Sequence, residues 1–156
     1  MDVDIPVAYV AQTTTMNCWA ASTAMLVGYR EGACIPDTAI VDQMSQADPS
    51  ANYHDGATQP ELRHVAQQYG FTQVYPVCQD AHGWQEWLDQ HGPLLIQVPG
   101  NAYHSIVIVG VNPDDSPPQI HVMDPWNGDA WISFDDLNQR YELAGAGWEN
   151  NVYALQ

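Results

Sequence analysis

A chain of 156 residues, 46% of them apolar, is long enough to bury the core of one domain, and we expect a single domain over residues 1–156. Nineteen acidic residues against three arginines and no lysine give a formal net charge of −16. This charge argues against binding to nucleic-acid phosphates or anionic membranes, and it favours basic partners or substrates, or simply a solubilising surface.

The chain shows no targeting or membrane segment. No apolar run approaches the ~18 residues that a membrane helix needs. The start at residues 1–6 is acidic and lacks the basic and apolar regions of a Sec signal. We therefore expect a protein made in the cytoplasm and, if it is exported, carried by a specialised secretion system. Met1 can equally mark a domain boundary within a longer protein.

The first part of the chain predicts helices after an extended lead-in at 3–11. Asp37 is the expected N-cap of the second helix. Thr58 and Glu61 form a capping box for the third helix, and Gly70 stops it. In the fourth helix Trp84 and Trp87 are expected in the core. The predicted helices cover residues 18–29, 36–44, 58–70 and 80–91.

The second part predicts strands, because apolar and β-branched residues gather in short runs. The expected strands cover residues 71–75, 94–98, 104–111, 119–123, 130–132 and 147–154, with one short helix at 133–141. Helices first and antiparallel strands second indicate an α+β fold, with a helical half packed on a sheet half.

Cys18 stands where the first helix begins, with Gln12 six residues upstream. A thiol is nucleophilic as the thiolate, which the partial positive charge and unpaired N–H groups of a helix N-terminus favour. The side-chain amide of Gln12 is a donor that can fold over the same place to hold an oxyanion. The pair predicts a nucleophile that still needs a base and a group to orient it.

His104 and Asp124 supply those groups. His104 opens a strongly apolar strand, and Asp124 closes the next one. If the two strands pair as a hairpin, both side chains lie near the same end of the sheet. The carboxylate then accepts from one imidazole nitrogen and leaves the other facing Cys18.

With Gln12, Cys18-Trp19-Ala20, His104 and Asp124 in this order, the chain resembles the papain-like cysteine peptidases. The resemblance spans residues 12–126 and implies a papain-like fold and a cysteine endopeptidase with a protein substrate and no cofactor. Papain itself has asparagine where Asp124 stands. This departure points to compact bacterial relatives, similar to the double-glycine peptidase domains of peptide-exporting ABC transporters and to secreted effector peptidases.

The resemblance and the chemistry agree on the roles. Cys18 attacks the carbonyl carbon, His104 moves the proton, and Asp124 orients His104. The Gln12 side chain and the Cys18 N–H hold the oxyanion. Trp19 is a candidate for substrate binding. Tyr103 and Trp126, each beside a proposed catalytic residue, are also candidates, with a place in the core as the alternative.

The sequence leaves other functions open. The same triad serves transglutaminases, deamidases and peptidoglycan amidases, and a degenerate module would only bind. The peptidase reading extends to a bacterial toxin or effector that cuts after small residues such as a double glycine, with a cognate inhibitor that is expected to be basic.

We expect the remaining cysteines and histidines to have structural rather than catalytic roles. Cys34 and Cys78 are expected as buried thiols, with a disulfide between them as the alternative. No metal-ligand spacing is present, so no metal site is expected. His121 is the competing base, but its place in its strand predicts that it faces solvent.

Overall fold

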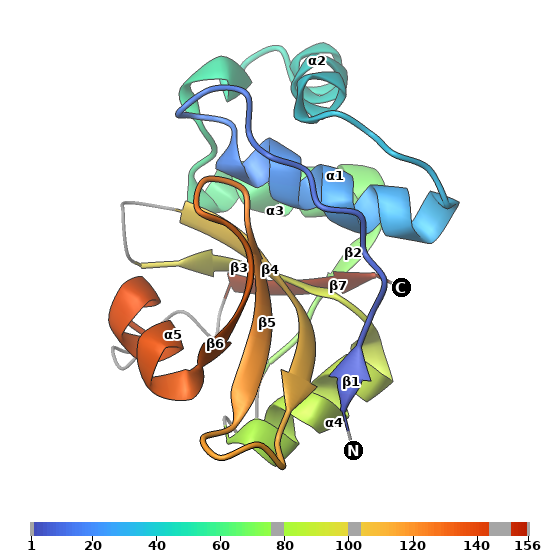
Figure 1. Ribbon diagram of the computed structural model, residues 1–156. Helices are drawn as coiled ribbons and strands as arrows, with labels where there is room; N and C mark the ends of the chain where they lie inside the picture. Colours follow the sequence, from blue (N-terminus) through green and yellow to red (C-terminus); the bar gives the residue numbers. More distant parts are fainter. Residues whose placement is uncertain (1, 76–79, 100–103, 144–150, 156) are drawn as a thin grey trace.

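The computed structural model (Figure 1) describes residues 2–75, 80–99, 104–143 and 151–155. These residues form an α+β fold, which confirms the expected class. In chain order the elements are β1 (Val3–Asp4), α1 (Cys18–Glu31), α2 (Asp37–Ala47), the 3-10 helix η1 (Tyr53–Asp55), α3 (Gln59–Tyr69), β2 (Phe71–Gln73), α4 (Ala81–His91), β3 (Leu94–Val98), β4 (His104–Asn112), β5 (Gln119–Asp124), β6 (Gly128–Ser133), α5 (Phe134–Tyr141) and β7 (Val152–Leu155).

The strands form one antiparallel sheet in the order β2-β7-β3-β4-β5-β6, and β1 lies alongside β4. The hairpin of β4 and β5 pairs Val107 with Met123. This register brings the first residue of β4 and the last residue of β5 to the same end of the sheet. Of the strand expected at 147–154, the structure describes only β7, because residues 147–150 lie outside the described part of the chain.

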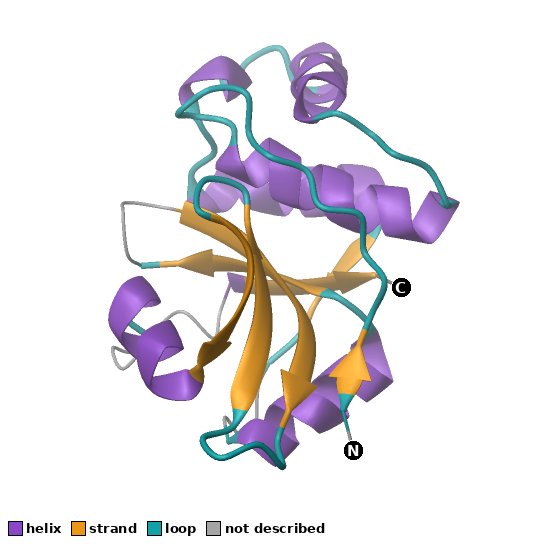
Figure 2. Ribbon diagram, in the orientation of Figure 1, coloured by secondary structure: helices purple, strands orange, loops and turns teal. Residues whose placement is uncertain are grey.

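The helices cover both faces of the sheet (Figures 1 and 2). On one face α1 packs between the sheet and α2, while α3 contacts α2 and β2, and every residue from Trp19 to Gly28 in α1 is buried. The small residues early in α1 therefore allow a central helix, as expected. On the other face α4 and α5 cover a second apolar cluster, so the helices are not confined to one half. Trp84 and Trp87 of α4 lie in that cluster, which confirms them as core residues.

The ends of the helices follow local signals, with one exception. Thr58 and Glu61 form the expected capping box, and Gly70 ends α3 in the left-handed conformation at φ 75°. The prediction that Asp37 caps α2 was wrong: Pro36 is the N-cap, and Asp37 is the first helical residue. The carboxylate of Asp37 instead accepts hydrogen bonds from Thr13 and Asn17, on the loop before α1. Within the described residues, no helix is both long and apolar enough to cross a membrane.

Candidate active site

Cys18 is the first residue of α1, as the sequence predicted. The preceding residue, Asn17, does not cap the helix with its side chain. Its amide instead donates a 3.3 Å hydrogen bond to Asp37. The N–H groups in the first turn of α1 therefore do not donate to the side chain of the cap residue, and Cys18 stands at the positive end of the helix dipole.

His104 begins β4 and is 8% exposed. Its Nε2 lies 2.8 Å from Oδ1 of Asp124, and a further hydrogen bond joins the ring to Cys18, which leaves Nδ1 as the nitrogen that meets the thiol. Burial by itself lowers the pKa of His104. The hydrogen bonds and electrostatic interactions of His104 with Asp124 and Cys18 outweigh that effect and raise the pKa of His104 to about 9.

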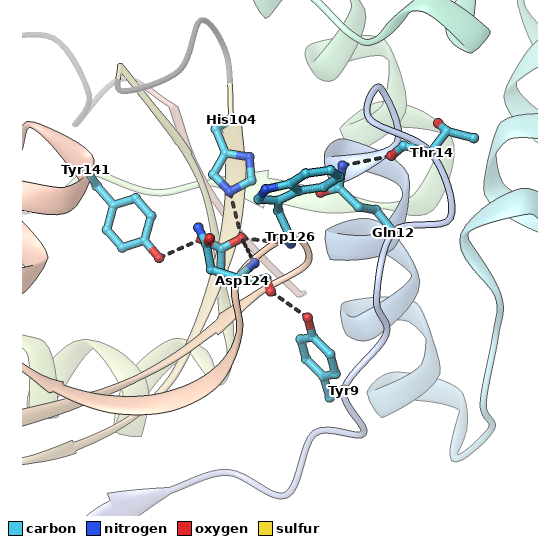
Figure 3. A network of polar contacts seen from close by, with 8 residues as sticks. Tyr9, Gln12, Thr14, His104, Asp124, Trp126 and Tyr141 are labelled. Atoms are coloured by element: carbon cyan, nitrogen blue, oxygen red, sulfur yellow. Dashed lines mark hydrogen bonds and ion pairs between the residues drawn. The ribbon is translucent and has the colours of Figure 1, made fainter.

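Asp124 ends β5 and is 1% exposed (Figure 3). Besides His104, Oδ1 accepts the backbone N–H groups of Trp126 and Asn127, at 2.9 and 3.1 Å. Oδ2 accepts the Asn127 amide at 2.8 Å and the Tyr141 hydroxyl at 2.7 Å. Burial favours the protonated acid, but these hydrogen bonds, led by that of His104, hold the pKa of Asp124 well below its usual range. The acid is therefore a fixed anion.

Gln12 lies on the loop before α1 and lines the same cavity as Cys18 and His104 (Figure 3). Its backbone N–H donates to the carbonyl of Pro125 at 3.0 Å, and its side-chain Nε2 donates to the carbonyl of Thr14 at 2.8 Å. Nearby, the hydroxyl of Tyr9 donates to the backbone carbonyl of Asp124 at 2.6 Å. The loop before α1 is thus fastened to the residues that follow β5.

Asp37 anchors the other side of that loop. Its Oδ2 accepts the backbone N–H and the hydroxyl of Thr13, at 2.7 and 3.0 Å, as well as the Asn17 amide. The side chain is 1% exposed, so these bonds are shielded from water. One buried carboxylate therefore fixes the backbone on both sides of the turn that leads to Cys18.

A cavity of about 610 Å³ adjoins these groups. Gln12, Cys18, His104 and Trp126 line it, and Trp126 is 60% exposed. The remaining lining residues come from two segments, 15–16 ahead of α1 and 52–61 around the start of α3. Cys18 and His104, the predicted nucleophile and base, thus both line a cavity large enough for part of a peptide.

The three candidates for substrate binding have different outcomes. The indole of Trp19 is 1% exposed and packs on Tyr53 in the core, with ring centres 5.3 Å apart, so the candidate role in substrate binding is corrected to a core role. Tyr103 lies outside the described residues. Trp126 stands on the cavity wall, as its candidate role requires.

The expectation that His121 faces solvent was wrong. His121 is 9% exposed, with Nδ1 2.7 Å from Asp4, Nε2 against Asp129 and the ring stacked on Trp131. Both ring nitrogens face carboxylates, so neither is directed at Cys18. Cys34 is also corrected, because it is exposed rather than buried.

Sequence reasoning missed the residues that support the triad. Tyr141 binds Asp124 from α5 and stacks on His104, with ring centres 6.4 Å apart. Asn127 had a local signal, since an Asp with polar residues just behind it commonly binds their backbone N–H groups. Tyr9 and Tyr141 had none. In the described part of the chain, no group of three or more His, Cys, Asp or Glu side chains could hold a metal ion.

Comparison with known proteins places this site in a family. The sequence model of the family described as papain-like cysteine protease AvrRpt2 matches residues 1–142. A search of curated protein sequences finds no significant match.

Solved structures share the fold at low sequence identity. The double-glycine motif protease from an AMS/PCAT transporter, solved with its leader peptide, is 19% identical, with 98% of this chain and 92% of that chain covered and a TM-score of 0.61. The peptidase domain of Streptococcus ComA, a bifunctional ABC transporter, is 18% identical, with coverage of 95% and 98% and a TM-score of 0.58. Digestive procathepsin L 3 of Tenebrio molitor is 11% identical, with coverage of 98% and 68% and a TM-score of 0.65.

The chain belongs to the papain-like cysteine protease family of AvrRpt2 and is a cysteine peptidase.

Proposed function

We propose that the protein is an endopeptidase that hydrolyses peptide bonds in protein substrates with a Cys18–His104–Asp124 triad. The Cys18 thiolate attacks the carbonyl carbon, and the protonated His104 gives its proton to the leaving amine. Water then attacks the thioester as His104 takes a proton from it, and breaking the C–S bond releases the acid and restores the Cys18 thiolate and the protonated His104. Asp124 holds the imidazole in place and balances its charge.

The observation that carries this proposal is the line of contacts from Cys18 through the buried His104 and Asp124, beside the 610 Å³ cavity. A pKa of about 9 keeps His104 protonated at neutral pH, which suits an acid that must protonate an amine. The fixed anion of Asp124 supports this state, because it cannot be neutralised near neutral pH.

The oxyanion is proposed to lie between the Cys18 N–H and the Gln12 side chain. The place of Cys18 in the first turn of α1, where the N–H groups point out of the end of the helix, supports the first donor. A primary amide carries two N–H bonds, and Thr14 accepts from the Gln12 Nε2, so the second N–H supplies the other donor. Both groups belong to the short segment that Asp37 and Pro125 hold, which supports a preorganised site.

The test compares the purified protein with its Cys18→Ala variant on a cell proteome, reading new protein N-termini by mass spectrometry. New termini that require Cys18 support the endopeptidase. A gain of about one dalton at glutamine, or release of muropeptides, without new termini would instead assign the triad to a deamidase or an amidase. Failure of Cys18 to react with a thiol probe in the reduced native protein would leave only a binding module.

We further propose that the peptidase acts as a toxin or effector exported to another cell and restrained in the producer by a basic inhibitor. The charge of −16 supports a basic partner. The double-glycine protease structure contains a leader peptide, which makes double-glycine peptides the first candidate substrates here. Growth arrest by the active protein, but not by Cys18→Ala, together with the host proteins that shorten, would test this role.

A further inference from the structure

Gln97 is a polar residue in a strand that is otherwise apolar. Strand β3 reads Leu-Leu-Ile-Gln-Val, and all five residues are buried. Gln97 is 3% exposed. Because an apolar side chain of similar size would fill this place without burying an amide, the glutamine needs a reason other than packing.

The contact that Gln97 makes provides that reason. Its Nε2 donates a 3.2 Å hydrogen bond to the backbone carbonyl of Ala57, 40 residues away in the sequence. Ala57 lies in the middle of residues 56–58, here called the wall segment, and all three of these residues line the active-site cavity. The Oε1 of Gln97 is buried and has no hydrogen-bond partner among the described residues. Only one end of the Gln97 amide is therefore paired: its nitrogen donates to Ala57, and its buried oxygen has no partner among the described residues.

The same bond joins the wall segment to the part of the sheet that carries the base. Strand β3 pairs with β4 so that Val98 faces His104 and Gln97 faces Ser105. The wall segment belongs to the loop before α3, where the capping box of Thr58 and Glu61 fixes its far end and Gly56 adopts a φ of 101° that favours glycine. Gln97 is therefore the side chain that ties the middle of this wall to the strand next to His104.

We infer that Gln97 is a positioning residue that sets the wall segment at the right distance from His104 for a peptide to bind between them. The inference rests on the proposed peptidase function, because it assigns the cavity to substrate. Gln97 does not line the cavity and acts through the Ala57 carbonyl. Its loss should weaken peptide binding and leave the reacting groups in place.

The experiment compares wild type with Gln97→Met, which keeps the length of the side chain and removes the amide. KM for a cleaved peptide should rise about three- to tenfold, the size expected for one net hydrogen bond, while kcat changes less than about twofold. The rate at which iodoacetamide alkylates Cys18 should stay within about twofold of wild type, since this small reagent does not need the wall. The unfolding midpoint should change little, because removal of the unpaired oxygen offsets the loss of the donor to the Ala57 carbonyl.

Gln119→Met is the matched control. Gln119 also donates its Nε2 to a backbone carbonyl at 3.2 Å, that of Pro117, but at the start of β5, far from Asp124. This variant should keep the wild-type KM. If Gln97→Met does not fold, Gln97→Asn, which is one methylene too short to reach Ala57, takes its place. A wild-type KM in a folded Gln97 variant overturns the inference, whereas a wild-type protein that cleaves nothing contradicts the proposed function instead.

Discussion

The backbone N–H of Gln12 donates to the carbonyl of Pro125, 3.0 Å away, and so joins the loop before α1 to the end of β5. Pro125 directly follows Asp124, whose own carbonyl accepts the hydroxyl of Tyr9. Two segments more than 110 residues apart are thus fastened at the site by backbone and tyrosine contacts. Because Gln12, the proposed oxyanion donor, and Asp124 sit on the two joined segments, these contacts hold the two residues together without a substrate.

Gln12→Ala should lower kcat by about 10²–10³, the usual cost of one oxyanion donor. The alkylation of Cys18 by iodoacetamide should change little, because it forms no oxyanion. Gln12→Glu is the matched variant, since it keeps the shape of the side chain and removes its N–H donors. A Gln12→Glu enzyme with the kcat of wild type would assign Gln12 to loop structure alone.

The alkaline limit of activity should follow His104. Its pKa is raised to about 9, so kcat/KM should fall as pH rises through that value and the imidazole loses the proton that the leaving amine needs. Asp124→Asn keeps an acceptor for Nε2 but removes the negative charge, so the alkaline limit should move toward neutral pH. A pH profile of kcat/KM for both proteins measures the shift. An unchanged limit in Asp124→Asn would contradict the proposed role of the carboxylate.

Folding stability should show the same titration. The pKa of His104 is higher in the folded protein than its ordinary value of 6.5, so its stabilising effect is complete below pH 6.5 and is lost as pH rises through about 9. Urea unfolding at pH 6.5 and 9.5 should therefore give a smaller free energy of unfolding at the higher pH. In His104→Asn this pH-dependent difference should shrink, and an equal difference in both proteins would contradict the assignment.

The sequence predicted the parts of the site that local signals determine. Helix α1 begins at Cys18, and the apolar runs of β4 and β5 bring His104 and Asp124 to one end of the sheet. The capping box at Thr58 needs only a four-residue pattern, so it too was predictable.

What escaped prediction depends on contacts between distant segments. Asp37 resembles an N-cap in its local sequence, but its carboxylate accepts hydrogen bonds from Thr13 and Asn17 instead. His121 alternates like a solvent-facing strand residue, yet Asp4 reaches it from the other end of the chain. Trp19 stands beside the nucleophile in sequence, and the turn of the helix directs it into the core.

Asp37→Ala should both destabilise the protein and impair it. The N–H of Thr13 and the buried amide of Asn17 would lose their acceptor, which should lower the free energy of unfolding by about 1–3 kcal/mol. Because these residues fix the turn before Cys18, kcat/KM should fall as well. Asp42→Ala, an exposed acid on the same helix, is the control and should change neither quantity. Wild-type stability in Asp37→Ala would show that the turn holds without this carboxylate.

The cavity should prefer substrates with a basic side chain. Asp55 and Glu61 line it, and no lining residue is Lys or Arg, while Met16 and Ala57 offer apolar surface to the stem of such a side chain. In a positional peptide library, Lys or Arg at one position should speed cleavage, and the double variant Asp55→Asn, Glu61→Gln should reduce that preference about two- to tenfold. Both replacements keep a hydrogen-bond acceptor, and glutamine preserves the capping box. Glu86→Gln with Asp89→Asn makes the same change on α4, across the sheet, and should retain the preference. An equal loss in both double variants would attribute the preference to the net charge of −16 rather than to the cavity.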